Sequence, residues 1–294
     1  MDILIPFVTS DDPVWKAEIA KYSPLFDESR YRDYGTLKYL FRGVEKFMPF
    51  IDRIVLLVSS ESQIPEWVNR RTVRVVSHAA IMPDYLLPTF NSSVIECFIN
   101  NIPDLSGRFI YANDDMFPLA PMTEDCFFRD ERPVVNYIKM EESDTPFLKM
   151  CRNTSNLART LVGDCDIKDW FYKPAHFFSP MLKQVNKALL DEAWKFLPGS
   201  YSRFRKEKNY NQYLYQDYYI ASGLSINAPF AYTAKRALLK DDTQVEGIVC
   251  DIKSGRYQMY CINDEYKGER VEDMMHLIRD AFEEVLPKKS VYEI

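Results

Sequence analysis

The sequence predicts an α/β fold in which a doubly wound, mostly parallel sheet is flanked by helices. Strand-like and helix-like segments alternate along the first part of the chain, as expected for right-handed crossovers between parallel strands. The stretch "RIVLLVSS" (53–60) is an apolar run, typical of a parallel strand covered on both faces. The strand-like stretch "RFIYA" (108–112) leads directly into Asn113, Asp114 and Asp115, and ligands of such sheets lie beyond the carboxyl ends of the strands.

The first half of the chain supplies the sheet. "MDILIPFV" (1–8) predicts a buried strand, and Asp12-Pro13 predicts the N-cap and first position of a helix that extends to about Lys21. Helical spacing of apolar residues predicts a helix over 36–48, and "TVRVVSH" predicts a strand that ends at His78. The next helix is capped by Asn91 or Ser92 and buries one apolar stripe, which consists of Val94, Ile95, Phe98, Ile99 and Ile102.

The second half is predicted to be mainly helical. Residues 136–172 read as irregular, whereas a helix is expected from Ser179 as N-cap, with Pro180 at its first position. A tyrosine-rich helix over about 209–221 and a final helix from Val271 follow. We therefore expect one domain over residues 1–294, with a core at about 1–135 and 245–294 and a helical insertion at about 140–225.

Composition limits the class of partner. The net charge of −6 argues against a nucleic-acid binder. No apolar run is long enough to cross a membrane, and "ILIPFV" is too short for a signal peptide. The six cysteines have no CxxC spacing, which favours reduced thiols. A cytoplasmic protein with at most peripheral membrane association is expected.

The acidic end of the strand "RFIYA" has two interpretations. Asn and Asp favour turns for local hydrogen-bonding reasons, so Asp114 and Asp115 could simply form a turn. Alternatively they bind a divalent cation, because Mg²⁺ is held by one or two carboxylates together with substrate phosphates. Asn263 and Asp264 follow a second strand-like stretch, "QMYCI", in the same way.

Single residues elsewhere carry less information. Glu96 lies off the buried stripe of its helix, and most helical glutamates are solvated. His176 precedes a helix and could be structural or face a cleft, while His78 stays undecided. Arg203 and Arg205 alternate around Phe204, so in an extended chain both would point to one side and could hold a phosphate, unless they form a solvated loop.

Several stretches together resemble the Stealth proteins, the hexose-1-phosphate transferases of bacterial capsule synthesis, whose family includes the catalytic part of lysosomal-enzyme GlcNAc-1-phosphotransferase. The resemblance covers about 1–15, 30–130, 173–220 and 258–294. The stretches that carry it are "RYRDYGTLKYLFRGVEKFMPFIDRIVLLV", "QIPEWVN", "LPTFNSSVIECFINNIPDLSGRFIYANDDMF", "CINDEY" and "LPKKSVYE".

The resemblance implies a Rossmann-like, GT-A-like core that transfers sugar-1-phosphate from a nucleotide-sugar donor to a hydroxyl of an acceptor glycan and releases a nucleoside monophosphate. The implied catalytic residues are His176, Glu96 and Arg205, with His176 or Glu96 as the base. Mg²⁺ or Mn²⁺ is expected on Asp115 and Asp264, supported by Asp114 and Asn263. The expected substrate contacts are Arg30, Arg203, Asn91 and Asp12.

One departure weakens the first region of the resemblance. The family's "VDGSDP" reads "VTSDDP" here, so Thr9 and Ser10 replace an acidic residue and a glycine. Two other functions fit the same residues: a metal-dependent glycosyltransferase that releases a nucleoside diphosphate, and a non-catalytic sugar-binding protein of a capsule locus. The nucleotide released distinguishes the two enzymes.

Overall fold

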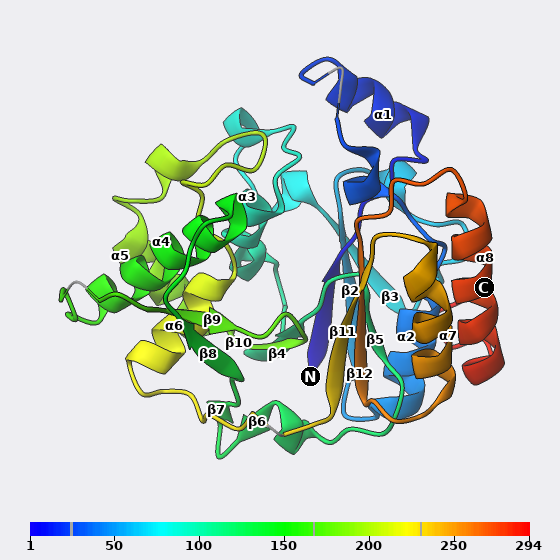
Figure 1. Ribbon diagram of the computed structural model, residues 1–294. Helices are drawn as coiled ribbons and strands as arrows, with labels where there is room; N and C mark the ends of the chain where they lie inside the picture. Colours follow the sequence, from blue (N-terminus) through cyan, green and yellow to red (C-terminus); the bar gives the residue numbers. More distant parts are fainter. Residues whose placement is uncertain (24–25, 167, 230) are drawn as a thin grey trace.

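The computed structural model describes residues 1–294 except residues 24–25, 167 and 230 (Figure 1). In the described part of the chain, the largest sheet has the strand order β10-β4-β1-β2-β3. The strands are β1 (Asp2–Pro6), β2 (Arg53–Val58), β3 (Val73–Ser77), β4 (Arg108–Tyr111) and β10 (Ser179–Leu182). All pairs are parallel except β10 with β4, which confirms the predicted mostly parallel α/β sheet.

A second sheet lies beside the first in Figure 1 and has the order β11-β12-β5. Its strands are β11 (Ala234–Leu239), β12 (Met259–Asp264) and β5 (Met116–Pro118). The segment 113–115 connects β4 of the first sheet to β5 of the second. Asp264 therefore ends a strand of the second sheet and does not project from the rim of the first.

Helices cover both faces of this arrangement. They are α1 (Pro13–Ala20), α2 (Leu37–Phe47), α3 (Ser92–Glu96), α4 (Pro146–Leu161), α5 (Lys183–Ala193), α6 (Tyr213–Ala221), α7 (Val245–Lys253) and α8 (Val271–Val285). In Figure 1, α2, α7 and α8 lie on one side of the sheets and α3–α6 on the other. Two short strand pairs, β6 (Phe128–Arg129) with β7 (Arg132–Pro133) and β8 (Tyr137–Met140) with β9 (Phe171–Pro174), complete the structure.

Alternate residues of the central strands enter two separate hydrophobic cores. In β1, Ile3 and Ile5 pack in the core beneath α2 and α8, whereas Leu4 packs in the core beneath α3, α5 and α6. In β2, Val55 and Leu57 pack in the second core, whereas Ile54, Leu56 and Val58 pack in the first. Burial on both faces explains why these strands are apolar without interruption.

A glycine allows α2 to approach β5 closely. A Cβ at Gly43 would lie 2.5 Å from the carbonyl oxygen of Pro118, so a side chain there would push the helix away from the strand. Because β5 directly follows Asp115, this contact fixes one end of the segment that carries the predicted metal ligands.

The helix predicted from Ser179 begins four residues later. Ser179–Leu182 form β10, whose residues pair antiparallel with β4, and the helix α5 starts at Lys183. Pro180 is compatible with this strand because β10 lies at the edge of its sheet. Local capping chemistry suggested a helix, but pairing with β4 determines the structure.

The neighbouring predictions need smaller corrections. The helix after Asn91 ends at Glu96, although all five residues of its predicted apolar stripe are buried. The segment 136–172 is not irregular, because it contains β8, β9 and α4. The signal for α4 was present in Thr145-Pro146, since the Thr145 side chain accepts from the backbone N–H of Leu148 and Pro146 opens the helix.

Two other expectations concern buried groups. His78, which the sequence left undecided, follows β3 and is buried, and its burial lowers the pKa of the imidazole to about 4. All six cysteines are free, and four of them, Cys97, Cys126, Cys151 and Cys261, are buried. No helix within the described ranges is both long and apolar enough to span a bilayer.

Candidate active site

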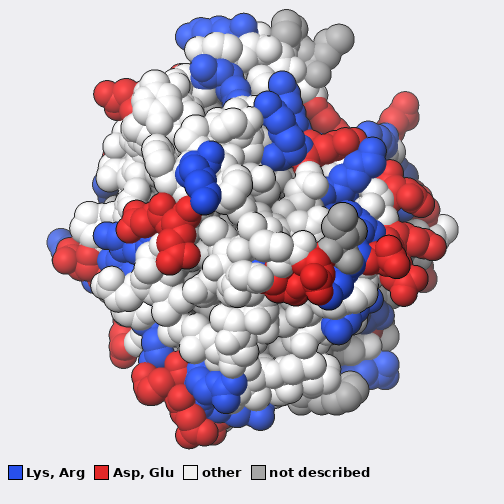
Figure 2. Space-filling model, turned by 90° about the vertical axis from the view of Figure 1, so that its left-hand side faces the viewer, with Lys and Arg blue, Asp and Glu red and all other residues white. Residues whose placement is uncertain are grey.

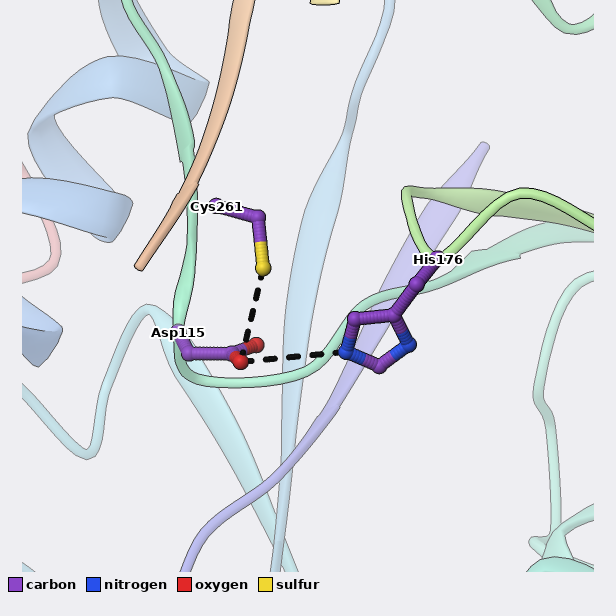
Figure 3. Close-up of side chains that lie close together, drawn as sticks. All are labelled: Asp115, His176 and Cys261. Carbon is purple, nitrogen blue, oxygen red and sulfur yellow. Dashed lines mark hydrogen bonds and ion pairs between the residues drawn. The ribbon is translucent and has the colours of Figure 1, made fainter. Parts of the chain in front are cut away.

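Three side chains from separate parts of the chain meet between the two sheets (Figure 3). Asp115 comes from the β4–β5 connection, His176 from the turn between β9 and β10, and Cys261 from the middle of β12. The Asp115 Oδ2 lies 3.7 Å from His176 Nε2 and 3.5 Å from Cys261 Sγ. The position is fixed by the backbone, because the N–H of Ile262 donates to the carbonyl oxygen of Asp115 at 2.9 Å.

One ligand atom from each of the three lies within 4.8 Å of the others, so they could hold a metal ion. Burial and the charge of Asp115 raise the pKa of the Cys261 thiol well above its usual range. The Cys261 thiol donates to Asp115 Oδ2 here, and it would have to lose its proton to bind a metal, because metals bind the thiolate. Asp115 Oδ1 is buried without a hydrogen-bond partner among the described residues, which suits a hard cation that takes oxygen ligands.

A negative charge on Asp114 is unfavourable in this structure. Burial, and then the charges of Asp115 and Asp33, raise the pKa of its carboxyl well above the usual range. Burial and the charge of Asp11 also raise the pKa of Asp33. Asp11 and Asp33 were not predicted as acidic neighbours of this site, because they lie about 80 to 100 residues away in the chain.

Glu96 is buried and does not face solvent as most helical glutamates do. Its Oε1 accepts from the hydroxyl of Tyr111 at 3.2 Å, and its Oε2 accepts from the backbone N–H of Gln212 at 2.8 Å. Burial raises the pKa of Glu96, although the Gln212 N–H, the charge of Arg205 and the Tyr111 hydroxyl act against that rise. Glu96 thus fixes the start of α6 near Arg205.

The two arginines around Phe204 have different partners. Arg205 Nη2 donates to Ser92 Oγ at 2.6 Å, at the beginning of α3, where its charge acts on Glu96. Arg203 instead donates to the carbonyl oxygen of Pro88 and lies over the ring of Tyr22. The two guanidinium groups therefore have different partners, and Arg205 is the one whose charge acts on Glu96. Their joint contact with one phosphate stays a prediction.

Asn91 and Asp12 act as helix caps in this structure. Asn91 caps α3, is fully buried, and donates to the Ser202 carbonyl oxygen and to Asn209 Oδ1, both at 2.9 Å. Asp12 caps α1 and also accepts from the side chains of Ser62 and Gln63. Direct contact of either residue with a substrate stays a prediction.

Cations gather near the carboxyl end of β12. Asp264 forms an ion pair with Arg32 at 2.8 Å and accepts from the backbone N–H of Tyr266. Arg30, which is exposed, and Arg205 both lower the pKa of Tyr31, against the rise that burial causes. Asp264 is not a member of the group formed by Asp115, His176 and Cys261, and its burial raises its pKa.

Two residues that the sequence analysis did not select complete the site. The hydroxyl of Tyr213 lies 3.4 Å from His176 Nδ1 and is thus placed to orient the imidazole ring. Arg236 on β11 donates to Asn263 Oδ1 at 2.6 Å, and its charge partly opposes the rise that burial causes in the pKa of Cys261. No local motif marks either residue, because tertiary contacts alone bring them to the site.

The face formed by the α3–α6 side of the molecule has no dominant charge. Figure 2 shows basic and acidic side chains intermixed around its edge, with a largely uncharged centre. Nucleic-acid binding surfaces concentrate positive charge, so this face gives no sign of a polyanion site.

Asp217, on α6, has a measurable consequence for stability. It is fully buried, neither carboxylate oxygen has a hydrogen-bond partner among the described residues, and burial raises its pKa well above the usual range. The folded protein therefore favours the protonated form, and its free energy of unfolding should fall as pH rises above about 4, the unfolded value. Asp217→Asn should remove this fall and add roughly 1–3 kcal/mol at pH 7.

Urea unfolding between pH 4 and pH 8 measures this effect. The matched control is Asp191→Asn, which removes an exposed carboxylate of α5 and should leave the pH dependence unchanged. Parallel pH profiles for Asp217→Asn and wild type would show that Asp217 is ionised in the folded state.

The fold and the site define an α/β protein with a carboxylate–histidine centre between two sheets. Residues 30–135 match the family model described as Stealth protein CR2, conserved region 2. The receptor polysaccharide phosphotransferase WefC of Streptococcus oralis is 30% identical, with 100% of this chain and 99% of that protein covered. The capsular polysaccharide phosphotransferase WcwK of Streptococcus pneumoniae is 28% identical over 100% of this chain and 99% of its own length. The chain belongs to the Stealth family.

Solved structures with a similar chain path include glycosyltransferases. The galactosyltransferase LgtC, in complex with donor and acceptor sugar analogs, has a TM-score of 0.47 at 12% identity and covers 99% of this chain and 97% of its own. Mouse xyloside xylosyltransferase 1 has a TM-score of 0.40 at 14% identity and covers 89% of this chain and 97% of its own.

Proposed function

We propose that this protein transfers sugar-1-phosphate from a nucleotide sugar to a hydroxyl of an acceptor glycan in the synthesis of a capsular or extracellular polysaccharide. The observation that carries the proposal is the similarity, over the whole chain, to named polysaccharide phosphotransferases, together with the cluster of Asp115 and His176. The acceptor oxygen attacks the sugar-linked phosphorus, the bond from that phosphorus to the bridging oxygen breaks, and a nucleoside monophosphate leaves.

The acidic residues would bind a divalent cation. Mg²⁺ or Mn²⁺ suits Asp115, whose Oδ1 is buried without a partner, with Asp114 supporting. Asp264 and Asn263 are proposed as further ligands on β12, although in this structure they are bonded to Arg32 and Arg236. When bound, the ion would neutralise the donor pyrophosphate.

The arginines would stabilise the negative charge of the donor. Arg205, which lies beside Glu96 and the start of α3, would stabilise the charge on the phosphoryl oxygens during displacement. Arg30 lies near enough to Arg205 for both to act on Tyr31, so it is a second candidate for the pyrophosphate. Arg203 would act indirectly, by holding the loop against Pro88.

His176 is the better placed of the two candidate bases. Both oxygens of Glu96 accept hydrogen bonds from within the chain, and the residue is buried. The His176 side chain is 23% exposed, its Nε2 faces Asp115, and its Nδ1 faces Tyr213. His176 would therefore take the proton of the acceptor hydroxyl, while Glu96 positions Arg205 and α6.

The nucleotide released tests the proposal. The purified protein is incubated with a panel of UDP- and GDP-sugars, Mg²⁺ and an acceptor glycan, and the nucleotide product is identified by chromatography. We expect the nucleoside monophosphate. Release of the nucleoside diphosphate would instead indicate a glycosyltransferase that attacks the anomeric carbon, and no release with any donor would indicate a sugar-binding protein.

A further inference from the structure

We infer that a pocket beside His176 binds an uncharged sugar residue of the acceptor glycan. The pocket has a volume of about 350 Å³, within the roughly 300–1,000 Å³ typical of ligand sites. Its lining includes Asn136, Phe177, Gln216, Tyr232, Thr233 and Tyr257. The inference rests on the proposed function, because it assigns a place to the acceptor of that reaction.

The pocket is continuous with the turn that carries the proposed base. Ala175 and Phe177, the residues on either side of His176, both line it. Ala234 of β11 also lines it, and Arg236, two residues further along that strand, donates to Asn263. The pocket therefore lies beside the turn that carries the imidazole proposed to take the acceptor proton.

The walls are aromatic and held in place by their own packing. The ring of Tyr232 packs edge-on against the ring of Phe177, with 6.5 Å between the ring centroids, and its centroid lies 5.6 Å from that of Phe127. The ring of Tyr257 similarly packs against the ring of Tyr260, with 6.0 Å between the ring centroids. Aromatic faces are suited to the apolar C–H surfaces of sugar rings, and fixed rings lose little conformational entropy on binding.

A buried amide supplies the polar contact. Gln216 on α6 is 3% exposed, and within the described residues its Oε1 is buried without a hydrogen-bond partner. An unpaired buried polar group is unfavourable, and one that lines a pocket can recover a hydrogen bond from a ligand. An amide both donates and accepts, which is what a sugar hydroxyl requires.

The charged residues near β12 indicate different places for the acceptor and the donor. Among the described residues that line the pocket there is no Asp, Glu, Lys or Arg. The pocket lies at the amino ends of β11 and β12, since Thr233 and Tyr257 precede these strands, whereas Arg32 and Asp264 lie at the carboxyl end of β12. An anionic donor is favoured at the cationic end and a neutral sugar at the uncharged end, with Asp115 between them.

The test measures both binding and turnover of the full chain. Binding of lactose and cellobiose as neutral probes, and of glucuronic acid and galactose 6-phosphate as charged probes, is followed by saturation-transfer NMR. We expect signals from the neutral probes that decrease at least 10-fold in Gln216→Leu, and weaker signals from the charged probes. The matched control is Gln184→Leu, which changes an exposed glutamine of α5 and should bind as wild type does.

The two proposals fail in different ways. If neutral sugars bind through Gln216 but no nucleoside monophosphate is ever released, the proposed function is wrong and the pocket assignment stands. If monophosphate is released but Gln216→Leu, shown to be folded by its thermal melting, leaves sugar binding and the acceptor KM unchanged, the pocket assignment is wrong. Absence of binding by every neutral probe, or tighter binding of the charged ones, also overturns it.

Discussion

Asp115→Asn is expected to lower kcat on the order of 10³-fold while leaving the fold intact. The substitution keeps the size of the side chain and one acceptor oxygen for the Cys261 thiol, but it removes the negative charge that we propose holds the cation beside the donor pyrophosphate. Turnover is measured as release of nucleoside monophosphate over a series of Mg²⁺ concentrations, and folding is monitored by thermal melting.

The control is Asp125→Asn, which makes the same change at an exposed position ten residues further along the chain. Wild-type turnover by Asp115→Asn would remove Asp115 from the mechanism. The same Mg²⁺ series applied to Asp264→Asn shows whether Asp264 shares the ion. A shared ligand should raise the Mg²⁺ concentration needed for half-maximal turnover, whereas a residue that only orients Arg32 should not.

Local chemistry in the sequence predicts much of the framework of this site. The caps at Asp12 and Asn91 follow from the preference of short polar side chains for helix N-termini, and the structure confirms both. The apolar run of β2 predicted a strand buried on both faces, and its residues do enter both cores. The position of Asp115 at the end of β4 follows from the same alternation of strand and helix.

Contacts between distant segments could not be predicted in this way. The pairing of β5 with β12 brings Cys261 to Asp115, and nothing in either segment specifies the partner. The N–H of Gln212 and the hydroxyl of Tyr111 hold Glu96 in the interior, although its place on the helix suggested solvent. For Glu96 and His176, family resemblance supplied a signal that composition and spacing lacked.

His176→Ala is expected to lower kcat by roughly 10²–10⁴-fold, because the proposed base would be lost. Tyr213→Phe should have a smaller effect of about 10-fold, since it removes only the hydroxyl that orients Nδ1. Tyr218→Phe, on the same helix, is the control and should match wild type.

The alternative base makes the opposite prediction, and this comparison decides between the two. If Glu96 took the proton, Glu96→Gln would cause the larger loss of kcat and His176→Ala the smaller one. The structure favours His176 because proton transfer requires a group that an acceptor hydroxyl can reach. The carboxylate of Glu96 is occupied by Tyr111 and Gln212, whereas the imidazole of His176 lies in a turn beside Asp115, and the residues on either side of it line the uncharged pocket. Wild-type kcat in His176→Ala would therefore also weaken the assignment of that pocket to the acceptor, because the two assignments depend on the same turn.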